Sequence, residues 1–220
     1  MFDKCIPKTK PKKFFKRTLM LLCRTFVVLN KLPVKLYMIM LGATPDGRYT
    51  EQHDIFFGIG DSLKELVPAM KAFWPEAKGK IHIDAWREVT NIENHSVIVT
   101  PKSSVNEAIQ NLYFINLGGY RPNEFEEYHY KVLALGATMA EASKKAKATT
   151  FYKHFDFKGA ESHIDDKFGI DIDDIYKVQD ILPEIFRGKY DLQFVKNELP
   201  TDEDTLHIGY VRIEKLEKLP

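Results

Sequence analysis

Two histidines in the first half of the chain stand two positions from a carboxylate, a spacing that could support chemistry. Glu51 precedes His53, and His82 precedes Asp84. Side chains two positions apart on a β-strand point to the same face of the sheet. Each pair would therefore place an imidazole beside a carboxylate, and the two pairs would converge if their strands are neighbours.

A similar pattern occurs in the second half of the chain. Glu127 and His129 repeat the first pair, and His163 and Asp165 repeat the second. Imidazole and carboxylate ligands suit zinc, iron or manganese. The same groups could act as general acids and bases, because histidine titrates near neutral pH. The candidate polar cluster consists of Glu51, His53, His82, Asp84, Glu127, His129, His163 and Asp165.

Three interpretations of this cluster stay open. Each His–acid pair could be a hydrogen-bonded clasp that fixes strand register, because buried polar groups need partners. The pairs could instead line a pocket for a ligand other than a metal, or they could bind a metal ion. The chain has no dense ligand motif of the H-E-x-x-H or C-x-x-C type. No motif implies a cofactor, so the cofactor is left unknown.

An internal repeat accounts for the second occurrence of the pattern. A shift of 76 positions aligns residues 36–72 with 112–148, with 11 identities in 37 positions and no gap. Random pairing gives roughly two identities at ordinary residue frequencies. Beyond this stretch, a shift of 81 positions aligns His82 with His163. The sequence therefore predicts a tandem duplication.

Each copy predicts the same order of elements. Apolar strands are expected at residues 36–41 and 112–117. Each is followed by a second strand, at residues 52–59 and 128–135. A helix follows in each copy, because Ser62 with Glu65, and Thr138 with Glu141, fit a capping box. The apolar helix stripes are Leu63, Leu66, Val67, Met70 and Phe73 in the first copy, and Met139, Ala142 and Ala146 in the second.

Further strands complete each unit. In the third strand, residues 80–90, alternation places Ile81, Ile83 and Ala85 on one face and His82, Asp84 and Trp86 on the other. Residues 96–100 are expected to close the first unit. The second unit continues through residues 175–181, and its tail adds strands at 191–195 and 206–213.

These elements predict an α+β fold. It consists of a duplicated ββαβ unit with an added strand, that is, two small sheets with one main helix each. The units would pack as a pseudo-twofold dimer joined across their first strands, with any ligand in the cleft between them. The expected boundaries are a basic head at 1–33, a first repeat at 34–101, a linker at 102–111 and a second repeat at 112–220. The head is either disordered or an over-extended start, with translation from Val34.

Charge and cysteine content restrict the class of function. Residues 1–35 carry a net charge of +9 and the rest of the chain carries −8. A mildly acidic body argues against a nucleic-acid partner, because phosphate binding needs a basic surface. Both cysteines, Cys5 and Cys23, lie in the head, so a reducing cytoplasm is expected. No membrane span is expected in residues 34–220, whereas a homo-oligomer stays open.

Two other segments were candidates for ligand sites. The acidic stretch Asp165-Asp166, Asp171, Asp173-Asp174 and Asp180 lacks the calcium-loop pattern and is expected to be a solvated rim. The corner formed by residues 58–62 could bind an anion at the start of a helix. A tight, capped corner is the expectation, because Asp61 would repel an anion.

Four runs of sequence carry a family resemblance: LYMIMLGATPDGRYTEQHDIFFGIG, KIHIDAWREVT, LYFINLGGYRPNEFEEYHYK and SHIDDKFGIDIDDIYKVQDIL. They resemble a small bacterial family called domain of unknown function 1543, which occurs as one or two copies per chain. The resemblance covers roughly residues 35–183. It implies a soluble bacterial protein, a duplication and a start near Val34. It implies no activity and assigns no residue a role.

Two functions are expected from these features. The first is ligand binding or protein interaction without catalysis in the bacterial cytoplasm. It follows from the absence of a cysteine in the body and of a serine in a G-x-S-x-G context. The alternative is a metal-dependent or acid–base enzyme that uses the Glu-x-His and His-x-Asp pairs. Counted from the second strand, the order β-α-β-β-β resembles metal enzymes built from paired modules of that kind.

Overall fold

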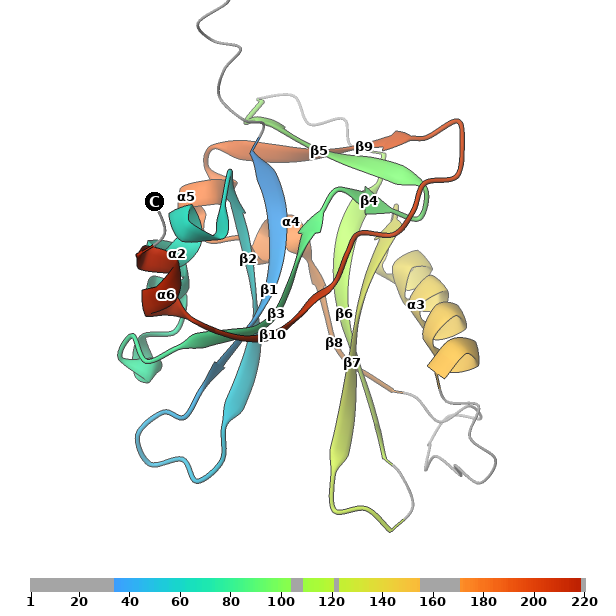
Figure 1. Ribbon diagram of the computed structural model, residues 1–220. Coiled ribbons are helices and arrows are strands. Elements are labelled where there is room, and N and C mark those ends of the chain that lie inside the picture. Colours follow the sequence, from blue (N-terminus) through green and yellow to red (C-terminus); the bar gives the residue numbers. More distant parts are fainter. Residues whose placement is uncertain (1–33, 104–108, 121–122, 155–170, 219–220) are drawn as a thin grey trace, which may run out of the picture. The chain divides into compact units, whose positions relative to one another are not determined.

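The computed structural model describes residues 34–103, 109–120, 123–154 and 171–218. The fold is α+β, with three antiparallel sheets and few helices (Figure 1). The head at residues 1–33, and the candidates His163 and Asp165, lie outside the described residues. Within the described part of the chain, no helix has both the length and the apolar character needed to cross a membrane.

The first sheet has the strand order β10-β3-β1-β2. Its strands are β1 (Lys35–Ala43), β2 (Gln52–Gly60), β3 (His82–Val89) and β10 (His207–Arg212). The strands predicted at 36–41 and 52–59 are confirmed, and they pair along their whole length. The last strand of the tail, which we grouped with the second half, pairs instead with β3.

Helix α2 (Leu63–Phe73) packs on one face of this sheet through the predicted stripe, of which Leu66, Val67 and Met70 are buried. Ser62 Oγ accepts a hydrogen bond from the Glu65 backbone N–H at 3.4 Å. The Glu65 carboxylate in turn accepts from the Asp61 backbone N–H at 2.9 Å. The carboxylate thus reaches one residue further back than it does in a capping box.

The second sheet has the order β7-β6-β8. Its strands are β6 (Asn111–Tyr120), β7 (Glu127–Gly136) and β8 (Asp171–Lys177), and α3 (Met139–His154) packs beside them. Thr138 and Glu141 repeat the cap of α2, with Glu141 accepting from the Ala137 backbone N–H. Ala142 and Ala146 are buried as predicted, but Met139 is half exposed. It is the first residue of the helix and precedes the turns that pack on the sheet.

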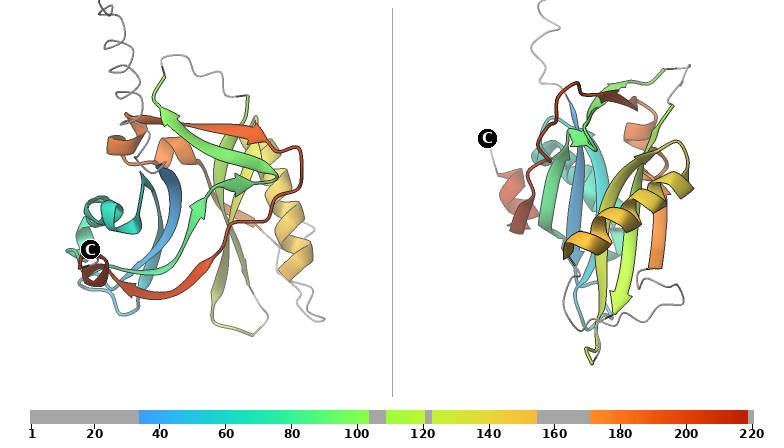
Figure 2. Two further views of the ribbon diagram at one scale, coloured as in Figure 1. Left: turned by 45° about the horizontal axis from the view of Figure 1, so that its top comes forward. Right: turned by 90° about the vertical axis from the view of Figure 1, so that its right-hand side faces the viewer.

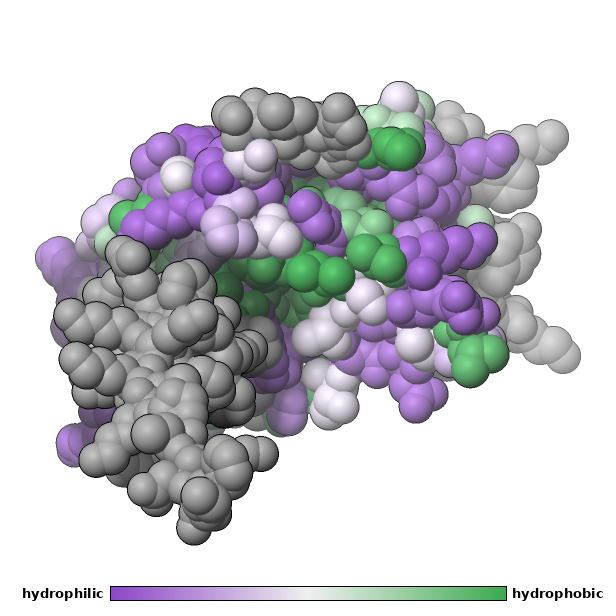
Figure 3. Space-filling view, turned by 90° about the horizontal axis from the view of Figure 1, so that it is seen from above, coloured by the Kyte–Doolittle hydropathy of each residue, from purple (hydrophilic) through white to green (hydrophobic). Residues whose placement is uncertain are grey.

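A third sheet, of order β4-β5-β9, crosses one end of the other two (Figure 2). It contains β4 (Asn91–Ile92), β5 (His95–Pro101) and β9 (Tyr190–Lys196). The prediction that residues 96–100 close the first unit is wrong. Glu93 and Asn94 both adopt positive φ and turn the chain back, so that β5 pairs with β4 and β9. Seen from above, this end shows apolar residues in its middle with hydrophilic residues around them (Figure 3).

Short helices complete the chain: η2 (Pro75–Ala77), α4 (Val178–Ile181), α5 (Glu184–Arg187) and α6 (Ile213–Glu217). The strand predicted through residues 175–181 therefore ends at Lys177 and continues as α4.

The first two sheets meet face to face. Phe57 of β2 and Phe114 of β6 stack edge to face, with ring centroids 5.7 Å apart, and both sheets contribute to one apolar core. The predicted joining of the units across their first strands is wrong. Each first strand already has a hydrogen-bonded neighbour on both sides, so neither has a free edge. In Figure 1, α2 and α3 lie on the outer sides of the two facing sheets.

The buried carboxylate of Asp191 links β9 to the residues that follow β5. Asp191 of β9 is 5% exposed. It accepts hydrogen bonds from Lys102 Nζ at 2.7 Å and from the Ser103 backbone N–H at 2.8 Å. Burial opposes its charge, but these two donors lower the pKa of Asp191 below its ordinary value.

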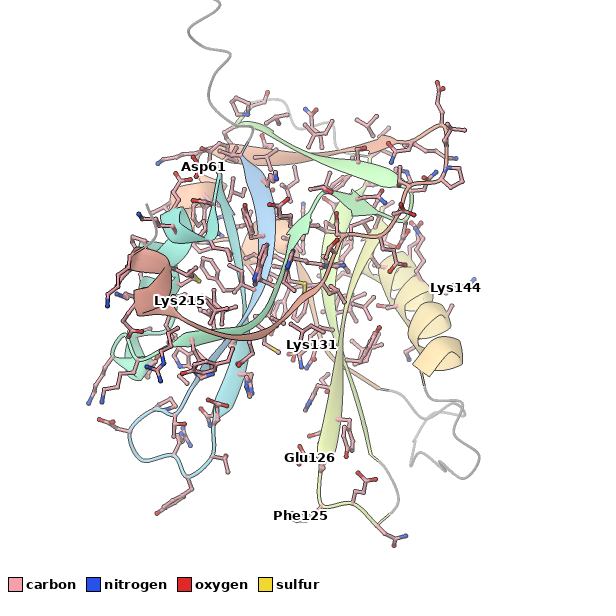
Figure 4. All side chains as sticks on the ribbon, viewed as in Figure 1. Asp61, Phe125, Glu126, Lys131, Lys144 and Lys215 are labelled. Carbon is pink, nitrogen blue, oxygen red and sulfur yellow. The ribbon has the colours of Figure 1, made fainter. Side chains whose placement is uncertain are left out.

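We expect Asp191→Asn to lower the free energy of unfolding by roughly 1–3 kcal/mol at pH 7, because it weakens a buried charged hydrogen bond. The folded carboxyl has the lower pKa, so its contribution is present above the unfolded value of about 3.9. That contribution disappears as the pH falls through the folded pKa. Urea unfolding at pH 7 and pH 3 measures it, with the exposed Glu126→Gln as control (Figure 4). A difference that does not change with pH would contradict the assignment.

Candidate functional site

The four residues singled out in the first half of the chain meet at one point. His53 Nε2 lies 3.2 Å from Asp84 Oδ2 and 3.7 Å from Glu51 Oε2. His82 Nε2 lies 3.3 Å from Asp84 Oδ2 and 3.1 Å from Glu51 Oε1. Each imidazole therefore contacts both carboxylates. We call these four residues the first cluster.

Strand β1, at the centre of the first sheet, makes room for the first cluster because its residue at that point is a glycine, Gly42. His53 on β2 and His82 on β3 are both the cross-strand partners of Gly42 on β1. A Cβ atom on Gly42 would lie 2.5 Å from Asp84 Oδ2 and would also collide with His82 Nε2. Glycine is needed here because the ligand groups occupy the space above its Cα.

A β-bulge in β3 brings the fourth residue to the same face. Met40 pairs with Ala85 and Leu41 pairs with Ile83, so Asp84 is the extra residue. The predicted alternation of β3 is therefore wrong beyond Asp84. Trp86 lies on the opposite face from the cluster, where its ring packs 6.2 Å from that of Tyr37.

Two polar atoms of the first cluster lack hydrogen-bond partners. Among the described residues, none bonds to His82 Nε2 or to Asp84 Oδ2, although both atoms are buried. The side chain of His82 is only 10% exposed, and the ring of Tyr210 packs on it at 4.4 Å. The N–O distances are short enough for hydrogen bonds, but the alignment is not suitable. Two buried polar atoms without a hydrogen bond are not what is expected of a hydrogen-bonded clasp.

A second cluster occupies the corresponding place in the second sheet. It consists of Glu127, His129 and Asp173, whose ligand atoms all lie within 4.8 Å of one another. His129 Nε2 is 3.2 Å from Asp173 Oδ2 and 3.9 Å from Glu127 Oε2. His129 pairs across the strands with Gly118. All three side chains are more exposed than that of His82.

Asp173 is the residue that the sequence interpretation missed. A bulge opposite Asn116 and Leu117 leaves Asp173 as the extra residue of β8. A Cβ atom on Gly118 would lie 2.7 Å from the Asp173 carboxyl carbon. Asp173 thus takes the position that Asp84 has in the first sheet; its side chain is exposed, as predicted, but it lies beside His129.

His163, which the sequence aligns with His82, lies outside the described residues, and Asp171 takes the matching register position. The backbone of Asp171 stands opposite Gly118, as His82 stands opposite Gly42. These two register positions lie 89 residues apart along the chain. The run Asp171-Ile172-Asp173 is similar in sequence to His82-Ile83-Asp84. It has aspartate at the position where the other run has histidine.

Both clusters open on one cavity between the sheets. Its volume is about 470 Å³, and His53 and His129 both line it. Ile55, Phe114, Asn116 and Lys131 form much of the remaining wall. Asn116 Oδ1 is buried, and no described residue bonds to it. This volume falls within the range of about 300–1,000 Å³ that is usual for small-molecule sites.

The corner at residues 58–62 is used for packing. The Glu65 carboxylate already accepts from the Asp61 backbone N–H. A Cβ atom on Gly60 would lie 2.9 Å from Glu65 Oε2. The corner is capped by the chain's own carboxylate, in agreement with the capping interpretation.

The segment that contains the first cluster is similar to a known protein family. The sequence pattern of the family described as "Domain of Unknown Function (DUF1543)" matches residues 48–99, which contain all four residues of the first cluster. The match supports assigning this segment to the DUF1543 family. The match covers a single copy.

A solved structure has a similar fold. It is the crystal structure of a protein Il1583 from Idiomarina loihiensis, which is 19% identical to this chain with a TM-score of 0.56. The similarity covers 82% of this chain and 98% of that one. At this identity the likeness concerns the fold alone. A search of curated protein sequences finds no significant match.

The contact between Gly118 and Asp173 can be tested with a double-mutant cycle. Gly118→Ala should destabilise the protein by roughly 1–3 kcal/mol, because the new methyl group has no room. The three atoms nearest to that methyl group all belong to Asp173. The penalty should therefore nearly vanish in an Asp173→Ala background. Denaturant unfolding of the four proteins measures it, and an equal penalty in both backgrounds would contradict the geometry.

Proposed function

We propose that the protein binds a divalent transition-metal ion through Glu51, His53, His82 and Asp84. The observation that supports this most strongly is the pair of buried atoms, His82 Nε2 and Asp84 Oδ2, which have no hydrogen-bond partner among the described residues. A buried polar group of this kind calls for an ion or a water. A metal ion would satisfy both atoms at once.

The N–O separations in the first cluster are close in size to those between ligands of a tetrahedral ion, with Glu51 presenting a different oxygen to each histidine. The four N–O distances around the first cluster are 3.1, 3.2, 3.3 and 3.7 Å. An ion with bonds of about 2.0–2.1 Å to nitrogen and oxygen separates neighbouring tetrahedral ligands by about 3.3–3.4 Å. Two imidazoles with two carboxylates favour zinc, iron or manganese over calcium or magnesium, which prefer oxygen ligands.

The second cluster is a more open centre of the same kind. Glu127, His129 and Asp173 offer three ligands, and all three side chains are well exposed. Three protein ligands leave a coordination position for water or for a bound ligand. This centre should bind a metal more weakly than the first and exchange it faster.

Metal binding is compatible with both expected classes of function. A protein that holds ions and a small ligand in the cavity between His53 and His129 needs no catalytic step. The open position of the second cluster would also allow a metal-dependent reaction, because a bound ion polarises a ligand or lowers the pKa of its water. We place the protein in a reducing bacterial cytoplasm, because residues 34–220 contain no cysteine.

We further infer that the two halves derive from a tandem duplication of one ββαβ unit. Supporting features are the matched pairing of the site histidine with Gly42 and with Gly118, and a bulged aspartate in each third strand. The two helix caps also share the same shifted pattern. Aligning the halves of related chains tests this origin. Both halves should keep the glycine, histidine and bulged acid, whereas chains with these residues in only one half would contradict it.

Metal content of the purified, chelator-treated and reloaded protein tests the first centre. We expect about one tightly bound ion and a second, weaker one with zinc, manganese or ferrous iron. His82→Gln should remove the tight ion, and His129→Gln should remove only the weak one. His95→Gln is the matched control, because His95 contacts a backbone carbonyl away from both clusters. Elemental analysis and calorimetric titration give both stoichiometries.

Folding must be separated from binding in this experiment. Glu51 has a side chain that is 46% exposed, so Glu51→Gln should keep the fold and still weaken the first centre. The thermal midpoint of wild type should rise with added metal, as binding to the native state requires. A wild-type protein that takes up none of the three metals in stoichiometric amount would refute the proposal.

A further inference from the structure

A second cavity, of about 340 Å³, lies between the first two sheets on another side of Lys131. Its wall comes from β3, the β4 turn, β7, α3 and the loop before β10. Five charged residues line it: Arg87, Glu93, Lys131, Lys145 and Glu203. Neither cluster of histidines contributes to this wall.

Two of the cations are half-buried without partners. Within the described part of the chain, neither the Arg87 nor the Lys131 side chain forms a hydrogen bond or an ion pair. Burial lowers the pKa of Lys131, with no other cause. Burial also lowers the pKa of Arg87, partly offset by the charges of Asp204 and Glu203. Unpaired charges are rarely withdrawn from water in this way, because the cost of desolvation is high.

Most of the nearby carboxylates already form hydrogen bonds or ion pairs with other groups. Glu93 pairs with Lys145 Nζ at 2.9 Å and accepts from the Leu135 backbone N–H at 3.2 Å. Asp204 accepts from the backbone N–H groups of Thr90 and Asn91. Only Glu203 remains among the carboxylates that line the cavity, and it is exposed. In this cavity the two cations therefore have one uncommitted acid, while Lys131 also lines the first cavity together with Asp54 and Asp174.

The pairing of the strands indicates that Lys131 is not required for the fold. In the first sheet, Met40 pairs with Ile55. At the corresponding positions of the second sheet, Asn116 pairs with Lys131. An apolar pair has thus been replaced by a polar one at a place where apolar residues suffice. Figure 4 shows Lys131 on the side of β7 that faces the first sheet.

We propose that Arg87 and Lys131 together bind a small oxyanion, the phosphate or carboxylate group of a low-molecular-weight ligand. The guanidinium of arginine suits such groups because its planar donors can hold two oxygens at once. The lysine supplies a second charge from the opposite sheet. A cavity of this volume is at the small end of ligand sites, which range over about 300–1,000 Å³, so a polymeric partner is disfavoured.

Titration of the metal-free full-length chain with inorganic phosphate and with succinate tests the site, using calorimetry at constant ionic strength with chloride as the reference anion. Saturable binding of at least one of the two is expected. Lys131→Ile should weaken it about tenfold or more, because one charged hydrogen bond is lost. Glu203→Gln should strengthen it, because a competing carboxylate is removed. The preferred anion distinguishes a phosphate ligand from a carboxylate ligand.

Lys144→Met is the matched control, since it removes the same charge from the exposed outer side of α3 (Figure 4). It should leave binding unchanged. Lys131→Ile copies the residue at the matching position of the first sheet, so it should fold. It should even raise the thermal midpoint without anion, because an unpaired buried charge is removed.

Two results would overturn the proposal. One is the absence of saturable binding of either anion to a folded wild-type protein. The other is an equal loss of affinity in Lys131→Ile and Lys144→Met, which would mean that only net charge matters. Because the titrations use metal-free protein, and because His82→Gln should bind the anion normally, failure here leaves the metal centres untouched. Failure of the metal experiment likewise leaves this site standing.

Discussion

In each of the two facing sheets, the central strand has a glycine at the point where its two neighbours carry the histidine and carboxylate cluster. Any side chain on Gly42 or Gly118 would occupy the volume that the bulged carboxylates take. The bulges themselves extend one strand by a residue, and this moves Asp84 and Asp173 onto the same face as the histidines. Buried polar atoms at such a place lower the stability of the fold unless they bind a partner. The arrangement of strands around it is therefore best understood as support for polar groups.

The layer order follows from which edges are free. Both central strands have neighbours on each side, so the halves do not join through them, and they meet through their faces instead. The outer faces are covered by α2 and α3, and the inner faces meet through Phe57 and Phe114. Packing is apolar near this aromatic contact, while His53 and His129 line the cavity alongside it. The contact thus holds two polar clusters at a fixed separation without a direct bond between them.

Local patterns in the sequence predicted the elements that depend on local physics. The strands, the helix caps and the meeting of Glu51, His53, His82 and Asp84 follow from periodicity and spacing. The position of Asp173 was missed because the run Asp171-Ile172-Asp173 begins with aspartate, whereas the run around Asp84 begins with histidine. The face of Trp86 was wrong because a bulge reverses the alternation. The partners of β5 and β10, and the desolvation of Arg87, depend on segments distant in sequence, which no local pattern encodes.

The position of β10 has a consequence for the order of assembly. β3 carries His82 and Asp84, yet its second neighbour is made more than a hundred residues later. Tyr210, whose ring covers His82, arrives with that same strand. During synthesis the first half of the chain can form its hairpin, but its ligand-bearing edge stays uncovered while the ribosome completes the rest. The surroundings of His82 are therefore complete only once β10 has been made, and an ion bound there as proposed would meet a different site in a nascent fragment than in the finished chain.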